Sequence, residues 1–235
     1  MNIKELAKEY KYKIETHAHT FPMSPCADFS PQEVIEKYAN IGYDAVVITN
    51  HYYRYSFSGD KKEIANKRFL DDFHKAEEAA KKYKLRVIFG MEIHFADSNN
   101  DYLLYGIDQN DLDILYGLTF TDYKTFYNTF KNDRNVILQA HPFRPNMVLQ
   151  EPELLDGIEV FNMHPGHNSK IGLAAQYAAN HPHFIKTCGT DFHHKDHQGL
   201  GGILTKTLPK DSFEFAEILK SRDYLLNISG NIIIP

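Results

Sequence analysis

The chain has 235 residues, 43% of them hydrophobic, and a formal net charge of −5 at pH 7, which suits one α/β domain spanning residues 1–235 with a full apolar core. The acidic balance argues against a nucleic-acid-binding module, because phosphate contacts need a clustered basic surface. No apolar run approaches the roughly 18 residues of a membrane span, and the first residues lack a signal-peptide core, so we expect a cytoplasmic protein that does not contact membranes.

Short apolar runs alternate with amphipathic segments from the beginning of the chain. A first short run at Lys13 and Ile14 leads into Glu15. Residues 30–33 (Ser-Pro-Gln-Glu) form a capping box with proline at the first helical position, which predicts a helix towards Asn40. Residues 44–49 then read as a buried strand. From about residue 60 to residue 84, apolar side chains recur in steps of three and four, which indicates one face of a helix.

The same alternation continues through the second half of the chain. Asp211 could cap a last helix after a short run at residues 202–204. Two further helices are expected around residues 123–130 and 171–179. The remaining expected strands cover residues 85–91, 102–105, 135–140, 157–161 and 184–188. This alternation predicts a parallel sheet with helices outside, and the periodicity leaves open whether the sheet closes into a barrel.

Five of the apolar runs end in side chains that can bind a metal ion. These side chains are His17 and His19, His51, Glu92 and His94, His141, and Asp191 and His193. Because the carboxyl ends of parallel strands meet at one edge, we expect the five groups to converge on one cavity. Imidazole and carboxylate together suit Zn, Mn or Fe. More than four ligands exceed what one tetrahedral zinc requires, which favours two or three divalent ions.

Several other histidines and the two cysteines have simpler interpretations. His94 can either bind a metal or support Glu92. Cys188, in the middle of a strand, is expected to be a small core residue, and two cysteines far apart in sequence fit a reducing compartment. The histidines expected on the surface or in loops are His74, His181, His183 and His197.

Taken in order, these motifs resemble those of the PHP (polymerase and histidinol phosphatase) family. The matching segments are His17-Ala18-His19-Thr20, Ile48-Thr49-Asn50-His51, Gly90-Met91-Glu92, Ala140-His141-Pro142-Phe143, Ile158-Glu159-Val160-Phe161-Asn162 and Gly189-Thr190-Asp191-Phe192-His193. The resemblance implies an α/β fold, a distorted (β/α)7 TIM-like barrel, and metal-dependent hydrolysis of phosphate monoesters as in histidinol phosphatase. In such an enzyme, a hydroxide on a di- or trinuclear metal centre attacks phosphorus.

The resemblance also implies a set of metal ligands. The first ion would be held by His17, His19, Glu92 and Asp191; the second by Glu92 and His141; and the third by His51, His193 and one residue shortly after the paired histidines. For this last ligand Cys26 is favoured over Asp28, and a soft thiolate there would favour Zn or Fe. A buried Cys26 thiol without a metal is the alternative. The implied catalytic residues are Glu92, Asp191 and His141.

Three positions depart from the family pattern. Glu15 and Asn50 each stand where an Asp is common, and no histidine lies between His94 and His141 to complete the second metal site. Asp101, His94 or water could take that place.

Three cations near the expected ligands could bind a phosphate group. Arg144 is the first choice, because a planar guanidinium can bind two phosphate oxygens at once; Arg54 and His164 follow. Each could instead be an exposed loop residue. The aromatic residues 52–57 could form a lid that stacks on a base or pack over the barrel mouth.

The small phosphorylated substrate is not identified by these features. Besides a phosphatase, the sequence allows a phosphodiesterase or exonuclease acting on short oligonucleotides, an amidohydrolase-type C–N hydrolase, or a non-catalytic metal-binding domain. Which metals bind, and the oligomeric state, are also left open.

Overall fold

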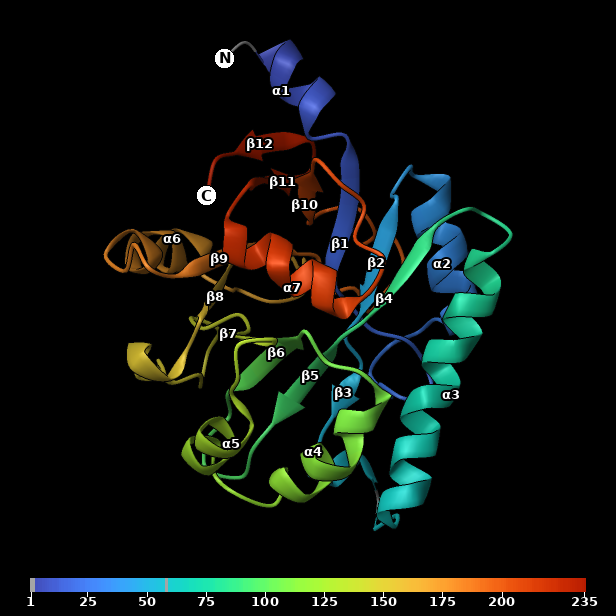
Figure 1. The fold of residues 1–235 in the computed structure, drawn as a ribbon, viewed down its shortest axis with the longest axis vertical. Coiled ribbons are helices and arrows are strands. Elements are labelled where there is room, and N and C mark those ends of the chain that lie inside the picture. Colours follow the sequence, from blue (N-terminus) through green and yellow to red (C-terminus); the bar gives the residue numbers. More distant parts are fainter. Residues whose placement is uncertain (1–2, 58) are drawn as a thin grey trace.

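A computed structural model describes residues 3–57 and 59–235, so expectations that involve residues 1, 2 or 58 lie outside the described chain. Its helices lie around a central set of strands, with α3 along one side, α6 on the opposite side and α7 across the front (Figure 1). The α-helices are α1 (Ile3–Glu9), α2 (Pro31–Asn40), α3 (Lys62–Ala80), α4 (Leu112–Leu118), α5 (Tyr123–Phe130), α6 (Ile171–Ala179) and α7 (Ser212–Ser221). Short 3-10 turns cover Arg54–Phe57, Gln109–Asp111 and Pro152–Leu154.

The strands form two six-stranded sheets. The first has the order β12-β11-β10-β1-β2-β4 and the second the order β3-β5-β6-β7-β8-β9. The strands are β1 (Tyr12–Ala18), β2 (Ala45–Ile48), β3 (His51–Tyr52), β4 (Arg86–Phe89), β5 (Met91–His94), β6 (Asp101–Tyr105), β7 (Val136–Gln139), β8 (Gly157–Asn162), β9 (Ile185–Gly189), β10 (Ile203–Thr205), β11 (Tyr224–Ile228) and β12 (Asn231–Ile233).

The two sheets join into a distorted barrel. β2 continues into β3 and β4 into β5, and the backbone bonds from Gly90 N to Ile48 O (3.1 Å) and from Glu92 N to Asn50 O (3.2 Å) carry the pairing across both breaks. On the other side, Ala18 and Phe192 form a parallel bridge between the end of β1 and the segment after β9. The ring therefore runs β1, β2–β3, β4–β5, β6, β7, β8, β9 and back to β1, which confirms the expected barrel.

One strand of the ring corrects the expected parallel sheet. β6 pairs antiparallel with both β5 and β7. The short connection explains this direction. Parallel neighbours need a crossover of a dozen or more residues, and only residues 95–100 lie between β5 and β6. β6 therefore presents its first residue, not its last, at the edge where the other strands end.

All five predicted helices are present, and the starts of two of them follow local chemistry. At α2, Ser30 Oγ accepts the Glu33 N–H and Glu33 Oε2 accepts the Ser30 N–H at 2.8 Å, so the capping box is confirmed. Asp211 caps α7 as expected. α3 is shorter than residues 60–84 suggested. The sequence analysis missed the helices α1 and α4 and the strands β3, β11 and β12.

Close packing between β1 and β9 depends on a glycine. A Cβ atom on Gly189 would lie 2.6 Å from His17 Cβ and 2.7 Å from Glu159 Oε1. These distances are too short, so β9 would have to move away from β1. Gly189 thus allows the end of β9 to approach the paired histidines of β1.

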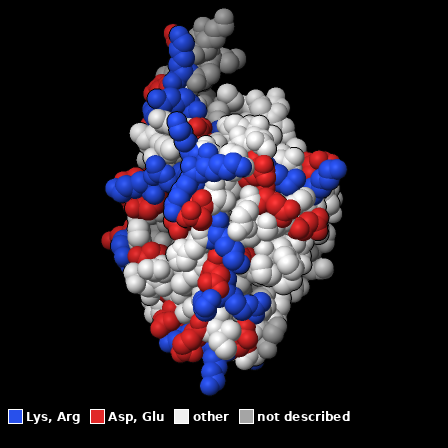
Figure 2. All heavy atoms as spheres, turned by 90° about the vertical axis from the view of Figure 1, so that its right-hand side faces the viewer, with Lys and Arg blue, Asp and Glu red and all other residues white. Residues whose placement is uncertain are grey.

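Basic and acidic side chains mix on the face that carries α2 and α3. Lys and Arg gather in its upper part with Asp and Glu between them (Figure 2). Among residues 3–57 and 59–235, no helix combines the length and apolarity needed to cross a bilayer.

Candidate metal centre

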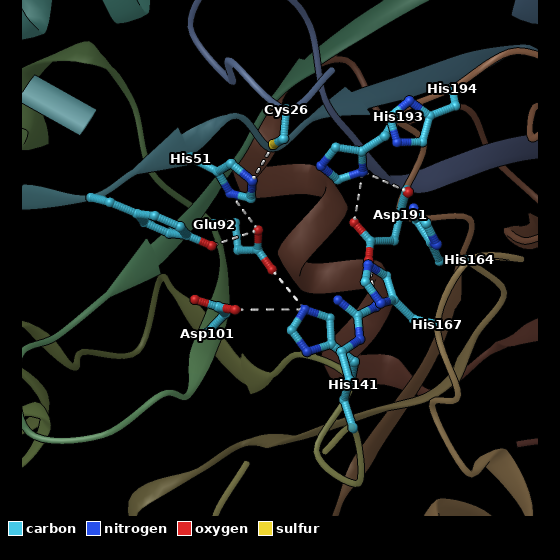
Figure 3. A pocket seen from close by; sticks show the side chains of 12 residues that line it. Cys26, His51, Glu92, Asp101, His141, His164, His167, Asp191, His193 and His194 are labelled. Carbon is cyan, nitrogen blue, oxygen red and sulfur yellow. Dashed lines mark hydrogen bonds and ion pairs between the residues drawn. The ribbon is translucent and has the colours of Figure 1, made fainter. Parts of the chain in front are cut away.

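A cavity of about 240 Å³ lies where the expected ligands come together. Its walls come from the segment after β1, from β3, β5 and the start of β6, and from the segments that follow β7, β8 and β9 (Figure 3). The lining residues are Cys26, His51, Tyr53, Glu92, Asp101, His141, Arg144, His164, His167, Asp191, His193 and His194. His17 and His19 are fully buried beside this lining. The structure therefore brings together the eight residues expected to bind metal.

Two buried imidazoles aim unpaired nitrogens at two carboxylates. His17 Nε2 lies 3.4 Å from both Glu92 Oε1 and Asp191 Oδ1. His19 Nε2 lies 3.5 Å from Glu92 Oε2 and 3.3 Å from Asp191 Oδ1. Neither nitrogen has a hydrogen-bond partner among the described residues, which is costly for a buried polar atom. Donor atoms around a tetrahedral ion with bonds of about 2.1 Å lie about 3.4 Å apart, so these four residues fit a metal ion.

A second group of donor atoms includes a residue that the sequence analysis left open. His141 Nε2 lies 3.1 Å from Glu92 Oε1 and 3.8 Å from Asp101 Oδ2, and the three residues could hold an ion together. Asp101 is the first residue of the reversed strand β6. His94 Nδ1 lies 3.0 Å from Asp101 Oδ1, so His94 supports this carboxylate from behind.

The third group lies on the other side of Glu92. His19, His51 and His193 are close enough to hold one ion, and Cys26 Sγ lies 3.2 Å from His51 Nε2. Asp28, the other candidate, is exposed and faces His194 Nδ1 at 3.0 Å. The structure thus brings the side chain of Cys26, and not that of Asp28, to His51.

Two buried carboxylates that the sequence analysis gave no role hold the ligands in place. Glu159 Oε1 lies 2.9 Å from His17 Nδ1, and its Oε2 accepts the backbone N–H of His141 at 3.1 Å. A proton on Nδ1 of His17 leaves the Nε2 lone pair free for a metal. Glu15 Oε1 accepts the backbone N–H groups of His17 at 3.0 Å and Thr190 at 2.9 Å. The sequence did contain one signal for Glu159. A charged residue within an apolar strand is buried, and a buried charge needs a partner.

Asn50, which replaces the more usual Asp, acts through a serine. Ser24 Oγ donates to Asn50 Oδ1 at 3.0 Å and accepts the His51 backbone N–H at 3.0 Å. The same hydroxyl lies 3.1 Å from His19 Nδ1. Asn50 therefore helps to orient both histidines without approaching the donor atoms itself.

The three expected phosphate-binding cations have different positions. Arg144 lines the cavity, with Nη2 2.6 Å from Asp191 Oδ2 and 2.9 Å from Asn162 Oδ1. His164 also lines it, together with His167 and His194, which the sequence analysis did not select. Arg54 is exposed outside this lining, and its guanidinium lies 5.1 Å from the centre of the Phe120 ring. Arg54 therefore lies over Phe120 and not in the cavity wall, although it follows His51 closely in sequence.

The aromatic segment at residues 52–57 contributes directly to the cavity wall. Tyr53 is buried, and its hydroxyl donates to Glu92 Oε2 at 3.0 Å. Tyr55 is 66% exposed, and its ring centre is 5.2 Å from that of Tyr53 and 5.7 Å from that of His94. One tyrosine thus packs against the ligands and the next remains available at the rim.

The electrostatics of the site keep carboxylates charged and one imidazole neutral. Burial alone would raise the pKa of Glu92, but the positive charges of His17 and His51 bring that pKa well below its ordinary value. Burial is likewise outweighed at Asp191, whose pKa is well below its ordinary value because of His17 and the neighbouring donors. Burial, with His193 and His51 nearby, lowers the pKa of His19 well below its ordinary value. Burial would lower the pKa of His17, but Glu159, Asp191 and Glu92 raise that pKa well above its ordinary value. Because ionised carboxylates and neutral imidazoles are the forms that bind metals, a metal ion would take the place of the Nε2 proton of His17.

The backbone is strained at two of these residues. His141 and Asp191 have φ angles of 31° and 55°, in a region that side chains other than glycine rarely adopt. Such conformations often occur where a side chain must be aimed at a functional site. Here both residues direct their side chains into the cavity (Figure 3).

Comparison with known proteins supports a specific family. Residues 15–189 match the sequence profile described as PHP domain. Over 149 residues the chain is 25% identical to the PolC-type DNA polymerase III of Clostridium perfringens, a match covering 63% of this chain and 9% of the polymerase. The chain thus spans less than a tenth of that relative.

Two solved structures are similar in fold. A two-domain protein from Bacteroides vulgatus, described as containing a predicted PHP-like metal-dependent phosphoesterase, has a TM-score of 0.68 and 19% identity, covering 94% of this chain and 66% of the other. An amidohydrolase from Chromobacterium violaceum with bound sulfate and no metal has a TM-score of 0.52 and 13% identity, covering 92% of this chain and 98% of the other. At these identities the similarity concerns the fold alone.

Proposed function

The chain belongs to the PHP domain family, and on this premise we propose that it is a metal-dependent phosphoesterase that hydrolyses small phosphate monoesters in the manner of a histidinol phosphatase. The observation that carries the proposal is the convergence of unpaired imidazole nitrogens and ionised carboxylates at ligand spacing, beside an arginine that faces the same cavity. We further propose that residues 1–235 act as one cytoplasmic domain.

The proposed ligands are those of the three groups described above. When bound, divalent ions such as Zn, Mn or Fe lower the pKa of water and neutralise charge on phosphate oxygens. Glu92 belongs to two of the groups and remains ionised, so it suits a shared position between ions. Asp191 and His141 complete the set of residues to which we assign catalytic roles.

Arg144 and His164 supply the phosphate contacts in this proposal. The Arg144 guanidinium can exchange its bond to Asp191 for a bidentate bond to phosphate oxygens. Burial lowers the pKa of His164 to about 3, so its ring is neutral at pH 7. His164 Nδ1 accepts the Gly166 N–H at 3.0 Å, which leaves Nε2–H as the donor to the substrate. Hydrolysis then consumes one water, breaks the ester P–O bond and releases an alcohol and inorganic phosphate.

The size of the cavity favours a small substrate. About 240 Å³ falls below the roughly 300–1,000 Å³ typical of sites for drug-sized ligands. A phosphorylated metabolite fits this volume better than a polynucleotide does.

A second candidate is hydrolysis of phosphodiester bonds in short nucleotides. The match to a DNA polymerase favours it, and so does the exposed ring of Tyr55 beside His94, because exposed aromatic rings stack on bases. C–N hydrolysis is a third class, given the fold shared with a protein described as an amidohydrolase.

A substrate panel tests the proposal. The metal-free chain is reloaded with Mn, Zn or Fe and offered phosphate monoesters, dinucleotides, and amide or deamination substrates, with release of phosphate, nucleotide or ammonia as the readout. We expect the highest kcat/KM with a small monoester. Turnover of dinucleotides alone would favour the second candidate, and turnover of C–N substrates alone would contradict phosphoester hydrolysis.

A further inference from the structure

The two ends of the cavity offer chemically different donor atoms. Cys26, His51 and His193 lie together on one side, Asp101 and His141 lie together on the other, and Glu92 lies between them (Figure 3). Three donors at the first end are one sulfur and two imidazole nitrogens. Two of the three donors at the second end are carboxylates.

The sulfur-containing end is built for a tetrahedral ion. Cys26 Sγ lies 3.2 Å from His51 Nε2, close to the about 3.6 Å that separates sulfur and nitrogen donors around a tetrahedral zinc. His193 Nδ1 is occupied by the backbone oxygen of Asp191 at 2.9 Å, so its Nε2 is the free donor. Fully buried His19 has an unpaired Nε2 at the border between the first group and this one, within reach of His51 and His193. This nitrogen indicates, independently of the thiol, that an ion is expected beside Cys26.

The carboxylate end is held in place from behind. His94 Nδ1 faces Asp101 Oδ1 at 3.0 Å, so Oδ2 remains available on the side of His141. Glu92 Oε1 lies 3.1 Å from the same His141 Nε2. The sequence has no histidine between positions 94 and 141, so no imidazole from that stretch competes with Asp101 as a donor.

We propose that this centre selects different metals at its two ends, with zinc at the Cys26–His51–His193 end and manganese at the Glu92–Asp101–His141 end. Thiolate and imidazole donors favour zinc, whereas carboxylate donors suit manganese. The inference rests on the proposed function in assuming that the cavity binds metals, and it adds which metal each end retains.

Metal content of single variants tests the proposal. The full chain is stripped with a chelator and equilibrated with manganese and with zinc held at a low free concentration, because zinc outcompetes manganese at most sites when both are free. Both metals are then counted by mass spectrometry. We expect wild type to retain both, Cys26→Ser to lose one zinc while keeping manganese, and Asp101→His to replace manganese by zinc.

Matched variants control for general damage. Cys188→Ser changes the other thiol, which is buried and bonded to the Asn227 carbonyl, and Asp28→Asn changes the carboxylate nearest in sequence to Cys26; both should keep the wild-type metal content. With cobalt in place of zinc, a thiolate charge-transfer absorption should be present in wild type, Cys188→Ser and Asp101→His. It should be absent from Cys26→Ser and from Cys26→His.

The results separate this inference from the proposed function. Unchanged zinc in Cys26→Ser, or unchanged manganese in Asp101→His, in a variant whose circular dichroism shows a folded chain, would overturn metal selection. Phosphate-ester turnover is measured on the same samples. If the two ends retain different metals but no phosphate ester is hydrolysed, the phosphoesterase proposal is rejected and the metal-selection proposal stands. If phosphate esters are hydrolysed but both ends retain the same metal, the metal-selection proposal is rejected and the phosphoesterase proposal stands.

Discussion

Carboxylates in the cavity and a carboxylate at the start of α2 both have lowered pKa values, but for different reasons. Glu92 and Asp191 are fully buried, and positive imidazoles such as His17 outweigh a burial effect that would raise their pKa values. Glu33 is exposed, and hydrogen bonds from Ser30 lower its pKa. The cavity therefore holds charges that are costly to bury unless they are paired, while α2 carries one that solvent already stabilises.

This difference indicates what each region contributes. A carboxylate at a helix start contributes about 0.3–1 kcal/mol, so Glu33 affects little beyond one helix end. The cavity charges depend on one another and on whatever ion binds them. Substitutions in the cavity should therefore have large effects on ligand binding and turnover. Substitutions of exposed charges such as Glu33 should have only small effects on the free energy of unfolding.

The largest effect is expected from His141→Ala. This change removes the imidazole nitrogen that lies beside both Glu92 and Asp101 and that we propose as a metal ligand. Loss of a group that acts within a catalytic set costs about 10⁴-fold in kcat. Steady-state kinetics with the best monoester measures the loss, and circular dichroism checks the fold. A rate equal to that of wild type would remove His141 from the site.

A smaller effect is expected from Glu159→Gln, which keeps the shape of the side chain but not its charge. Glu159 fixes His17 through Nδ1, and loss of such a supporting carboxylate typically weakens metal binding by about 10–100-fold. Metal titration followed by calorimetry gives the affinity. Glu217→Gln, an exposed partner of Lys220, is the matched control; equal affinities in the two variants would show that Glu159 has no special role.

Arg144→Ala should have a more moderate effect, chiefly on KM. The guanidinium exchanges one carboxylate partner for phosphate, so we expect a net loss of about 1.5 kcal/mol, or roughly tenfold in KM. Arg54→Ala is the control, since that guanidinium lies over Phe120. If both variants keep the wild-type KM, Arg144 does not bind the phosphate; if only Arg54→Ala raises KM, the placement of the two arginines is wrong.

The smallest effect is expected at the surface, from Glu33→Ala. A carboxylate at a helix start contributes about 0.3–1 kcal/mol. Because the pKa of Glu33 is lowered by folding, its contribution is complete above the unfolded value of about 4.3 and disappears as pH falls through the lower folded value. Urea unfolding of wild type and variant should show a larger difference in the free energy of unfolding at pH 7 than at about pH 3; a difference that grows in acid would contradict this assignment.

Much of the fold could be predicted because local signals agreed with tertiary structure. The capping box at Ser30 and the cap at Asp211 fixed two helix starts, and periodicity marked α3, α5 and α6. The direction of β6 could not be read from periodicity, since it depends on the length of the preceding connection. α1 and α4 have seven residues each, too few to show a reliable helical repeat.

The site was partly predictable for a related reason. Histidines and acids at strand ends could be recognised because parallel strands share one polarity, and this reasoning identified His17, His51 and His141. Asp101 did not fit that rule, because it begins a strand that runs the other way. Glu159 lies inside a strand, and its importance comes from packing against His17, which no spacing in the sequence reveals.

The hairpin formed by β5 and β6 sets a constraint on how this chain can change. His94 lies opposite Asp101, and Ile93 lies opposite Tyr102. Alternate residues of a strand face opposite sides. Deleting one residue from the segment 95–100 would therefore shift the pairing and turn Tyr102, a core residue, towards the cavity in place of a carboxylate. Insertions and deletions in residues 95–100 should therefore be as poorly tolerated as substitution of a metal donor, although this segment contributes no donor itself.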